Sequence, residues 1–389
     1  MQIEKLKQAF SEHFPGRQPT IASSAPGRVN LLGEHTDYND GFVLPMAIDA
    51  RITLLGALNG TNEVNLYSLD FEAKDSFSLE AITQTEIHRW SNYIRGVCDL
   101  LQKDGYNLAG MDIVLQGNVP LGAGLSSSAA LEVATALFVD KLNDLKVNKT
   151  ELVKLAQRAE NEFVGVNCGI MDQFISMLGE KDHALFLDCR SLDYQTVAAR
   201  FEEAGCTLVV INSGVKRGLV DSEYNLRRSQ CEEAVQLLKK DLPEITALRD
   251  VTIEHLDLIN ALPEALRKRA RHVVSENQRV LDAIEFLKAD NLEAFGELLY
   301  ASHESLRDDY EVSCSELDLL VEIARSTPGT LGARMTGAGF GGSMIILTAK
   351  SAVEELKNRV MDEYTAKTQI TPEIFTFKAV EGATIIPLD

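Results

Sequence analysis

Residues 120–134 read PLGAGLSSSAALEVA, a glycine turn followed by three serines and the start of an apolar helical repeat. Backbone amides at a helix N-terminus, together with the helix dipole, favour an anion, and Gly122 and Gly124 let the backbone approach it closely. The serines can cap the helix or offer a hydroxyl to a metal held by phosphates. The stretch therefore predicts a phosphate-binding loop, with an ordinary serine-capped helix as the alternative. It is not a Walker loop, because no Gly-Lys-Ser/Thr ends it.

Hydrophobic patterning on both sides of this loop indicates an α+β chain. Runs of β-branched and aliphatic residues predict strands, at 51–58, 63–69, 111–117 and 206–212. Apolar residues at helical spacing predict an amphipathic helix over about 128–143, a second helix over about 149–163, and a mostly helical region over about 220–326. Strand character returns at 336–348. Strands at both ends with helices between them favour two domains, 1–200 and 201–389.

Composition excludes several classes of protein. The formal net charge of −20 over 389 residues opposes a broad nucleic-acid or anionic-membrane surface. The six cysteines lie far apart without a CxxC pair, which disfavours structural zinc and a disulfide framework and favours a reducing compartment. Charges at Glu4, Lys5 and Lys7 leave no apolar core for a signal peptide, and Pro120 interrupts the longest uncharged stretch, 113–131. We expect a cytoplasmic protein.

Two polar segments suggest catalysis on a hydroxylated ligand. GRVNLLGEHTDYNDG, 27–41, gathers donors and acceptors that suit a polyhydroxylated molecule, with a solvated loop as the alternative. In AENEFVGVNCGIMDQF, 159–174, Asp172 follows a glycine turn among apolar residues, where burial raises a carboxylate's affinity for a proton. Asp172 is therefore the candidate general base, unless it only caps the following helix. Periodicity does not decide whether Glu160 or Glu162 faces the site.

A second glycine cluster, TGAGFGG at 336–342, contains the GxGxxG spacing of dinucleotide-binding folds. That fingerprint must open a helix, whereas the residues after this cluster continue as a strand. We therefore expect a tight loop packed against a ligand or another backbone, or a purely structural turn.

In this order, the four segments resemble the kinase family that comprises galactokinases, homoserine kinases, mevalonate kinases and phosphomevalonate kinases. GRVNLLGEHTDY looks like the signature of the galactokinase branch, PLGAGLSSSA like the phosphate loop of the family, and TGAGFGG like its third glycine motif. The resemblance implies an N-terminal domain similar to the second domain of ribosomal protein S5, a ferredoxin-like C-terminal domain, and a site in the cleft between them. It also implies transfer of the γ-phosphate of ATP to the C1 hydroxyl of α-D-galactose, the entry step of galactose catabolism.

The same similarity implies roles for individual residues. Asp172 matches the proposed catalytic base and Arg28 the proposed transition-state stabiliser, and both groups suit a loose phosphoryl-transfer state whose charge lies on oxygens. The residues that would contact the sugar are Glu34, His35, Thr36, Asp37 and Tyr224. Those that would bind the nucleotide are Ser68, Gly122, Ala123, Gly124, Leu125, Ser126, Ser127 and Ser128. Mg²⁺ would be held by Ser128 and Glu160.

The partners that this hypothesis implies are galactose and Mg-ATP, with no nucleic acid or membrane, for a monomeric enzyme. Three other functions remain open at this point. One is a regulatory protein that binds sugar and ATP without turnover, and the intact Ser127, Ser128, Ala129 and Ala130 oppose it. Another is a sister kinase acting on N-acetylgalactosamine, which needs a roomier pocket at the second carbon of the sugar. The third and most distant is an NAD-dependent oxidoreductase.

Overall fold

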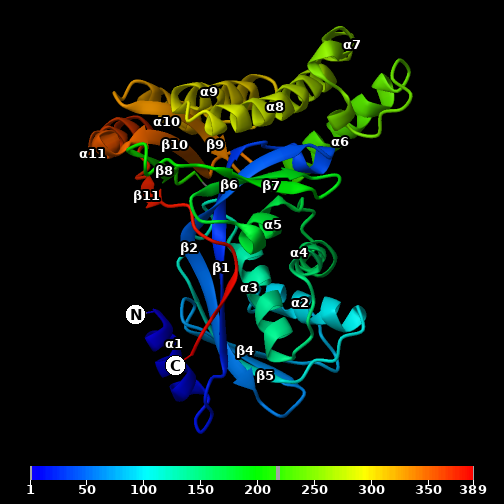
Figure 1. Cartoon of the computed structure of the whole chain (residues 1–389), viewed down its shortest axis with the longest axis vertical. Helices are drawn as coiled ribbons and strands as arrows, with labels where there is room; N and C mark the ends of the chain where they lie inside the picture. Colours follow the sequence, from blue (N-terminus) through cyan, green and yellow to red (C-terminus); the bar gives the residue numbers. More distant parts are fainter. Residues whose placement is uncertain (1, 216–219, 389) are drawn as a thin grey trace.

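The structure, a computed structural model, describes residues 2–215 and 220–388. It has two β-sheets, placed one above the other along the longest axis (Figure 1). The long strands β1 (Ile21–Leu32) and β2 (Phe42–Leu58) belong to the lower sheet and run up toward the other one. Helices are segregated around each sheet and do not alternate with parallel strands, so the fold is α+β, as predicted.

The lower sheet has the strand order β12-β1-β2-β5-β3-β4, with β6 added on β2 and β7 on β6. All its pairs are antiparallel except β3 with β5. The remaining strands are β3 (Glu63–Ser68), β4 (Ala73–Ser78), β5 (Met111–Gly117), β6 (His183–Asp188), β7 (Tyr194–Ala198) and β12 (Thr384–Ile386). The register of β1 on β2 shifts between Pro26 and Arg28. Such an irregularity re-aims a side chain, and here it lies at Arg28, a residue of the site described below.

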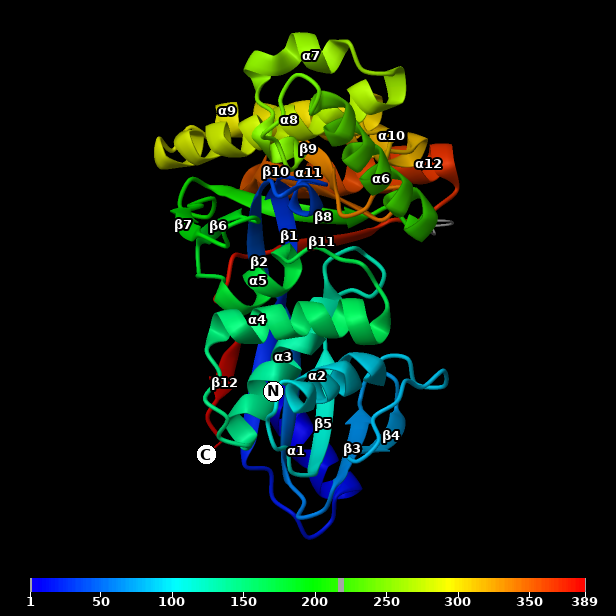
Figure 2. The same ribbon diagram turned by 90° about the vertical axis from the view of Figure 1, so that its right-hand side faces the viewer.

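Helix α3 (Ser127–Leu142) crosses the centre of the lower part, behind α4 in Figure 2. Every residue from Ala129 to Asp140 is buried, because β1, β2 and three helices pack around it. The expectation of an amphipathic helix is therefore wrong: α3 has no solvent face, and it buries the carboxylates of Glu132 and Asp140. The other helices here are α1 (Gln2–His13), α2 (Ser91–Lys103), α4 (Lys149–Arg158) and α5 (Met171–Leu178).

The helix predicted over 149–163 is confirmed with one change. The α-helical part ends at Arg158, and the chain continues as a π-helical turn, Ala159–Val164. Single π-helical turns widen a helix locally and occur often at functional sites. This turn carries Glu160.

The upper sheet is antiparallel with the order β11-β8-β10-β9. Its strands are β8 (Cys206–Asn212), β9 (Thr330–Thr336), β10 (Ser343–Ala349) and β11 (Glu373–Phe377). Within the range 336–348, the strand character expected after the glycine cluster is confirmed as β10, whereas β9 lies before the cluster and escapes prediction because TLGARMT mixes glycine and arginine with few β-formers. The glycine cluster makes the tight loop between β9 and β10 and opens no helix, as predicted.

Helices of the second half cover the upper sheet (Figure 1) and confirm the helical region over 220–326. They are α6 (Val220–Leu238), α7 (Leu256–Asn260), α8 (Glu264–Lys288), α9 (Leu292–Asp308), α10 (Ser315–Arg325), α11 (Val353–Arg359) and α12 (Thr365–Thr368). Among the described residues, no helix combines the length and apolar character needed to cross a membrane.

One hydrophobic core continues through both parts. Leu54 and Leu115 of the lower sheet and Val210 and Ile345 of the upper sheet all belong to it. The upper sheet begins at Cys206, close to the boundary expected at residue 200, but β12 returns to the lower sheet beside β1. Both ends of the chain therefore support the lower part, and the shared core holds the two parts in a fixed relation around the site.

Candidate active site

A cleft of about 440 Å³ lies where the N-terminal ends of α3 and α5 meet the loops after β1 and β9. This volume suits a small-molecule site. The candidate residues that line the cleft are Arg28, Glu34, His35, Asp37, Gly122, Gly124, Leu125, Ser126, Ser127, Ser128, Glu160, Asp172 and Tyr224. Three candidates of the described chain, Thr36, Ala123 and Ser68, do not belong to this lining.

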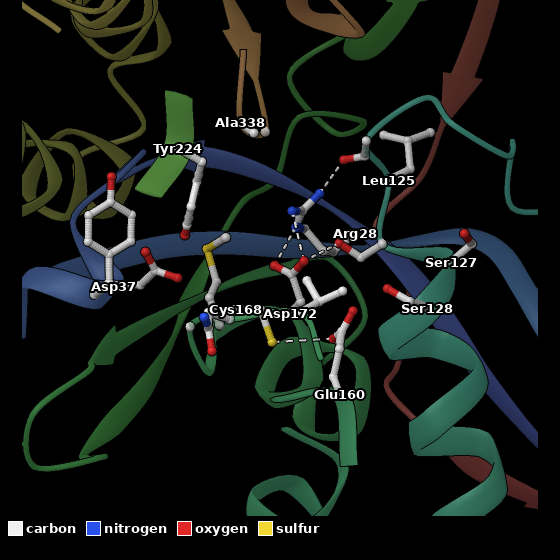
Figure 3. A pocket seen from close by; sticks show the side chains of 18 of the residues that line it. Arg28, Asp37, Leu125, Ser127, Ser128, Glu160, Cys168, Asp172, Tyr224 and Ala338 are labelled. Atoms are coloured by element: carbon white, nitrogen blue, oxygen red, sulfur yellow. Dashed lines mark hydrogen bonds and ion pairs between the residues drawn. The ribbon is translucent and has the colours of Figure 1, made fainter. Parts of the chain in front are cut away.

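Arg28 and Asp172 form an ion pair at the centre of the cleft (Figure 3). Nε and Nη2 of Arg28 each donate to a different oxygen of Asp172, both at 2.9 Å. Charge-assisted pairs with two parallel hydrogen bonds fix geometry as well as charge. Asp172 is the second residue of α5, whose N-cap is Ile170, so its carboxylate serves Arg28 and does not cap the helix.

The phosphate-loop geometry differs from a serine-capped helix. Gly122 and Gly124 have φ angles of 72° and 74°, in the left-handed region that favours glycine. Ser126 is the N-cap of α3, but its side chain makes no cap and its hydroxyl donates to Oδ2 of Asp172 at 2.5 Å. The first amides of α3 therefore have no side-chain partner at the N-cap, which leaves them available to an anion.

Both halves of the molecule hold this loop in place. The amide of Arg28 donates to the carbonyl of Leu125 at 3.1 Å, and its Nη1 donates to the carbonyl of Gly124. From the upper sheet, the hydroxyl of Ser343 donates to the carbonyl of Ala123 at 2.6 Å. Ala123 is fully buried, so it ties the loop to β10 and does not face the cleft.

Glu160 lies beside the start of α3 and has neutral hydrogen-bond partners. It accepts from the amide of Gln173 at 2.6 Å and from the thiol of Cys168 at 3.3 Å, and the hydroxyl of Ser128 also contacts it. Burial, followed by the nearby Asp172, raises the pKa of Glu160 above the usual glutamate range. A cation beside Glu160 would relieve that penalty.

Hydroxyl and carboxylate oxygens are ligands that Mg²⁺ takes, with phosphates and water completing its shell. Ser128 and Glu160 therefore fit this ion as partial ligands. No group of three or more His, Cys, Asp and Glu side chains in the described ranges could hold a metal on its own. The arrangement suits a metal that arrives with a nucleotide.

A second acidic side chain lies behind Glu160 and was not anticipated from the sequence. Glu132 of α3 is completely buried and accepts from the same Gln173 amide at 3.1 Å. Burial, with Glu160 as the next cause, holds the pKa of Glu132 well above its usual range. The feature that could have revealed it is a single glutamate inside the apolar run AALEVATALFV. Helical periodicity alone would place that glutamate on the surface.

His35 and Asp37 form the opposite wall of the cleft. Burial lowers the pKa of His35 to about 3, so the ring is neutral, and its Nδ1 contacts the hydroxyl of Tyr38 at 2.8 Å. The alternative of a solvated loop is wrong, because Glu34, His35 and Thr36 are all buried. Burial, followed by Asp172, raises the pKa of Asp37 to about 6. The ring of Tyr224 lies 5.7 Å from that of His35, between centroids.

Gly169 gives Asp37 the space it occupies. A Cβ at this position would lie 1.8 Å from Oδ2 of Asp37 and 2.5 Å from its Cγ. Sequence reasoning used this glycine only as a turn marker. A side chain at position 169 would therefore collide with Asp37, a candidate sugar-binding residue.

Two of the candidates outside the lining have structural contacts. The hydroxyl of Thr36 lies 2.8 Å from the carbonyl of Gly33 and 2.6 Å from that of Phe42, which closes the loop that carries Glu34 and Asp37. Ser68 ends β3, is fully buried, and its hydroxyl accepts from the amide of Phe71 at 3.4 Å.

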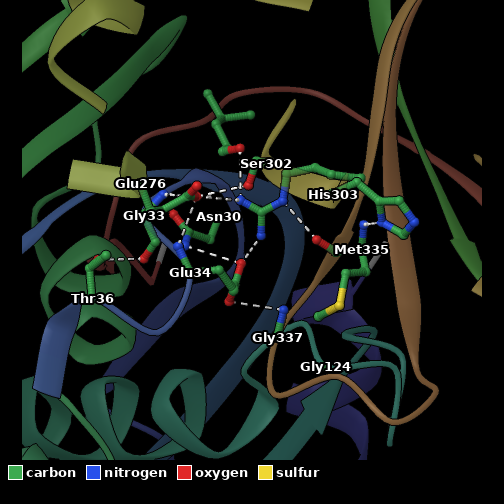
Figure 4. Close-up of polar contacts among 12 residues, drawn as sticks. Asn30, Gly33, Glu34, Thr36, Gly124, Glu276, Ser302, His303, Met335 and Gly337 are labelled. Atoms are coloured by element: carbon green, nitrogen blue, oxygen red, sulfur yellow. Dashed lines mark hydrogen bonds and ion pairs between the residues drawn. The ribbon is translucent and has the colours of Figure 1, made fainter. Parts of the chain in front are cut away.

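Glu34 is engaged by the upper half of the molecule (Figure 4). Its Oε2 pairs with Arg334 of β9 and accepts from the amide of Asn30 at 3.2 Å. Its Oε1 accepts from the backbone amide of Gly337 at 3.0 Å. The polar segment 27–41 and the glycine cluster 336–342 thus meet at one carboxylate, although Glu34 and Gly337 lie 303 positions apart in the sequence.

Family models match three parts of the chain. The model described as the galactokinase galactose-binding signature matches residues 8–58, the GHMP kinases N terminal domain matches 92–180, and the GHMP kinases C terminal model matches 283–366. The first covers Arg28 and the loop of Glu34 and Asp37, and the second covers the phosphate loop, Glu160 and Asp172.

Curated relatives and solved structures extend this similarity over the whole chain. The chain is 48% identical to the galactokinase of Chloroflexus aurantiacus over 94% of its length and 93% of the relative, and 42% identical to that of Haemophilus influenzae over 99% of both. The crystal structure of Lactococcus lactis galactokinase complexed with galactose matches with a TM-score of 0.94 and 38% identity, over 99% of this chain and 100% of that one. A mevalonate kinase structure, at 20% identity and a TM-score of 0.66, shares the fold.

Proposed function

The chain belongs to the galactokinase family within the GHMP kinases, and on that premise we propose that it is an ATP-dependent sugar 1-kinase. It transfers the γ-phosphate of ATP to the C1 hydroxyl of α-D-galactose, giving α-D-galactose 1-phosphate and ADP, the entry step of galactose catabolism. One observation carries this proposal most directly. The Arg28–Asp172 pair lies in one cleft between the galactose-binding signature and the phosphate loop.

The nucleotide phosphates bind the loop that precedes α3, from Gly122 to Ser128. Its left-handed glycines and the amides at the start of α3 support this role. Ala123 contributes through its position in the loop, because its side chain is buried. For Ser68, a place near the nucleotide stays a prediction from the resemblance.

Galactose binds the opposite wall of the cleft. Glu34, Asp37 and the neutral ring of His35 supply acceptors for sugar hydroxyls, and Tyr224 supplies an aromatic face and a hydroxyl. Thr36 acts on the sugar only by holding the loop closed, through the contacts of its hydroxyl with the carbonyls of Gly33 and Phe42.

Transfer needs one proton acceptor and fixed positive charge. The C1 oxygen attacks the γ-phosphorus, the bond from that phosphorus to the β–γ bridging oxygen breaks, and the hydroxyl proton passes to Asp172. Oδ2 of Asp172 already accepts from Arg28 and Ser126, whereas Oδ1 accepts only from Arg28, so Oδ1 keeps an acceptor position for the sugar. Arg28 stabilises the charge on the transferring oxygens. Mg²⁺, held by Ser128 and Glu160, would neutralise phosphate charge when bound.

We further propose a monomer in a reducing compartment such as the cytoplasm. The cleft is built within one chain, and the six cysteines are all free, which suits a compartment that keeps thiols reduced. The net charge of −20 supports small molecules as partners, without nucleic acid or membrane. Sedimentation of the purified protein at micromolar concentration tests the monomer, and a stable dimer would refute it.

A sugar-panel assay tests the proposed activity. Purified protein with Mg-ATP is supplied with galactose, glucose or N-acetylgalactosamine, and ADP and sugar phosphate are measured together. We expect equal amounts of both products, with galactose as the preferred acceptor. Galactose binding without ADP release would indicate a sensor, and a preference for N-acetylgalactosamine would indicate the sister kinase.

A further inference from the structure

Among the described residues, Arg334 of β9 is the largest side chain that is completely buried. Its Nε donates to the carbonyl of Met335 at 2.7 Å, its Nη1 donates to the carbonyl of Leu31 at 3.0 Å, and its Nη2 pairs with Oε2 of Glu34 (Figure 4). Burying a guanidinium is expensive unless every part of it is paired, and a buried ion pair is weak evidence for stability alone. A role in fixing geometry is a better explanation for its position.

The carboxylate that Arg334 pairs with has one oxygen only partly used. Oε2 of Glu34 accepts from both Arg334 and Asn30, so its acceptor positions are filled. Oε1 accepts only from the amide of Gly337, which leaves one position for another donor. Glu34 and Gly337 both line the cleft, so a ligand hydroxyl can supply that donor.

The backbone that carries Glu34 is fixed from the same side. Oε1 of Glu276, on α8, accepts from the amide of Gly33 at 2.9 Å and from that of Glu34 at 3.3 Å. The same oxygen lies 3.9 Å from Nη1 of Arg334. With its backbone held by Glu276 and one carboxylate oxygen held by Arg334, the Glu34 side chain has little freedom to turn.

We propose that Arg334 is a positioning residue for sugar recognition, which holds the carboxylate of Glu34 so that its partly free oxygen accepts a hydroxyl of the acceptor sugar. This inference rests on the proposed function, because it assumes that Glu34 contacts the sugar. Arg334 lies in β9 and does not line the cleft, so the inference gives a residue outside the cleft an effect on sugar affinity. Arg334 touches neither substrate and acts only through Glu34.

Arg334→Lys tests the inference, because lysine keeps the charge and loses the forked geometry. We expect the KM for galactose to rise about 10- to 100-fold, because that factor corresponds to the loss of one charge-assisted hydrogen bond. The kcat and the KM for ATP should change by less than about threefold. A monodeoxygalactose lacking the hydroxyl that binds Glu34 should bind the parent and the variant equally. The inference would be overturned if Arg334→Lys weakened the binding of galactose and of all four monodeoxygalactoses equally. A parallel rise in the KM for galactose and the KM for ATP would also overturn it.

Arg95→Lys is the matched control. Arg95 is also buried and also pairs with one carboxylate, that of Asp75, while donating to the carbonyls of Thr83 and Ser76. It lies on α2, away from Glu34, so the change should lower the melting temperature and leave the KM for galactose unaltered. A rise in that KM equal to the rise in Arg334→Lys would make the effect a general result of losing a buried arginine and contradict the inference.

A second variant keeps the test decisive if Arg334→Lys does not fold. Glu34→Gln/Arg334→Met removes both charges together, so no unpaired charge is buried. We expect it to bind galactose no more tightly than the monodeoxygalactose that lacks the hydroxyl bound by Glu34, because the side chain at position 34 is no longer held in place. A preference for galactose over that monodeoxygalactose as large as in the parent would overturn the inference. Failure of the parent protein to phosphorylate galactose would instead refute the proposed function.

Discussion

Arg28 and Asp172 hold each other at two points, through hydrogen bonds of 2.9 Å from Nε and from Nη2 to the two oxygens of one carboxylate. The third donor group of the guanidinium contacts the carbonyl of Gly124 in the phosphate loop. One side chain therefore links the candidate base to the loop at which we propose that the phosphates bind. Through this contact, the positive charge of Arg28 and the proton acceptor Asp172 can act on the same phosphoryl group during transfer.

Asp172→Asn should abolish most turnover while leaving galactose affinity nearly unchanged. Asparagine keeps the size of the side chain but cannot accept the proton, and a lost general base usually lowers rates by about 10²- to 10⁴-fold. Steady-state kcat and calorimetric binding of galactose measure the two quantities separately. Asp172→Ala is the companion variant. Retained turnover in both variants would remove Asp172 as the base.

Ser128→Ala and Glu160→Gln should each raise the Mg²⁺ concentration needed for half-maximal activity. Ser128→Ala removes a hydroxyl ligand, and Glu160→Gln replaces a charged carboxylate with a neutral amide, whose oxygen binds the ion more weakly. A titration of Mg²⁺ at saturating ATP and galactose gives the comparison, and direct Mg-ATP binding gives a readout independent of turnover. Cys168→Ser is a control, because it alters a partner of Glu160 but no proposed ligand. Unchanged titrations in both ligand variants would contradict the assignment.

Gly169→Ala should weaken galactose binding without altering ATP binding. The added methyl would lie 1.8 Å from Oδ2 of Asp37, so that carboxylate must rotate away. Losing its hydrogen bond to a sugar hydroxyl corresponds to about 1.5–3 kcal/mol, or roughly 10- to 100-fold in affinity. Gly165→Ala is a poorer control, because its φ of 92° strains any side chain. Gly117→Ala, at the end of β5 and outside the cleft lining, is more suitable, because a Cβ there would meet the side chain of Ile52, at 3.0 Å, and no residue of the cleft. Equal galactose affinity in Gly169→Ala and the parent would refute the steric account.

Asp37→Asn should flatten the fall in stability of the ligand-free protein between pH 4 and pH 7. Burial and Asp172 raise the pKa of Asp37 to about 6, so the folded protein holds a proton there that the unfolded chain, with an ordinary value near 3.8, releases earlier. The parent therefore loses unfolding free energy as pH rises from about 4 to about 6, by on the order of 1–3 kcal/mol with solvent screening in the cleft.

Urea unfolding at pH 4.5 and pH 7.5 checks this prediction through the difference between the two proteins. Burial lowers the pKa of His272 and that of His35 to about 3, so both histidines oppose this trend by raising the free energy of unfolding as pH rises from about 3 to about 6.5. The opposing effect is common to the parent and the variant. Identical pH dependence in the two would show that Asp37 does not titrate in this window.

Sequence patterns identified candidate site residues more successfully than they predicted how the helices pack. Arg28, Asp172 and the loop from Gly122 to Ser128 line one cleft, as the family resemblance implied, whereas the residue types alone only marked each segment as a separate candidate. The burial of α3 on every side was missed, since helical periodicity reports spacing and not how many neighbours pack on a helix. The π-helical turn that carries Glu160 left no signal in AENEFV.

Long-range pairing marks the limit of such reasoning. Arg334 and Glu34 are 300 positions apart, and Gln173 bridges to Glu132 across 41. Nothing local in TLGARMT distinguishes an arginine that is fully buried from one on the surface. The strand order of the upper sheet, with β9 next to β10, accompanies contacts of Arg334 with Leu31 at the end of β1 and with Glu34 in the loop that follows.

The position of the sugar's C1 hydroxyl tests the central claim most directly. A crystal structure with galactose, Mg²⁺ and a non-hydrolysable ATP analogue would measure it. We expect the C1 oxygen to lie about 2.6–3.2 Å from a carboxylate oxygen of Asp172, facing a γ-phosphate held by Arg28 and the start of α3. A C1 oxygen turned away from Asp172, or phosphates bound away from the loop of Gly122 to Ser128, would contradict the account.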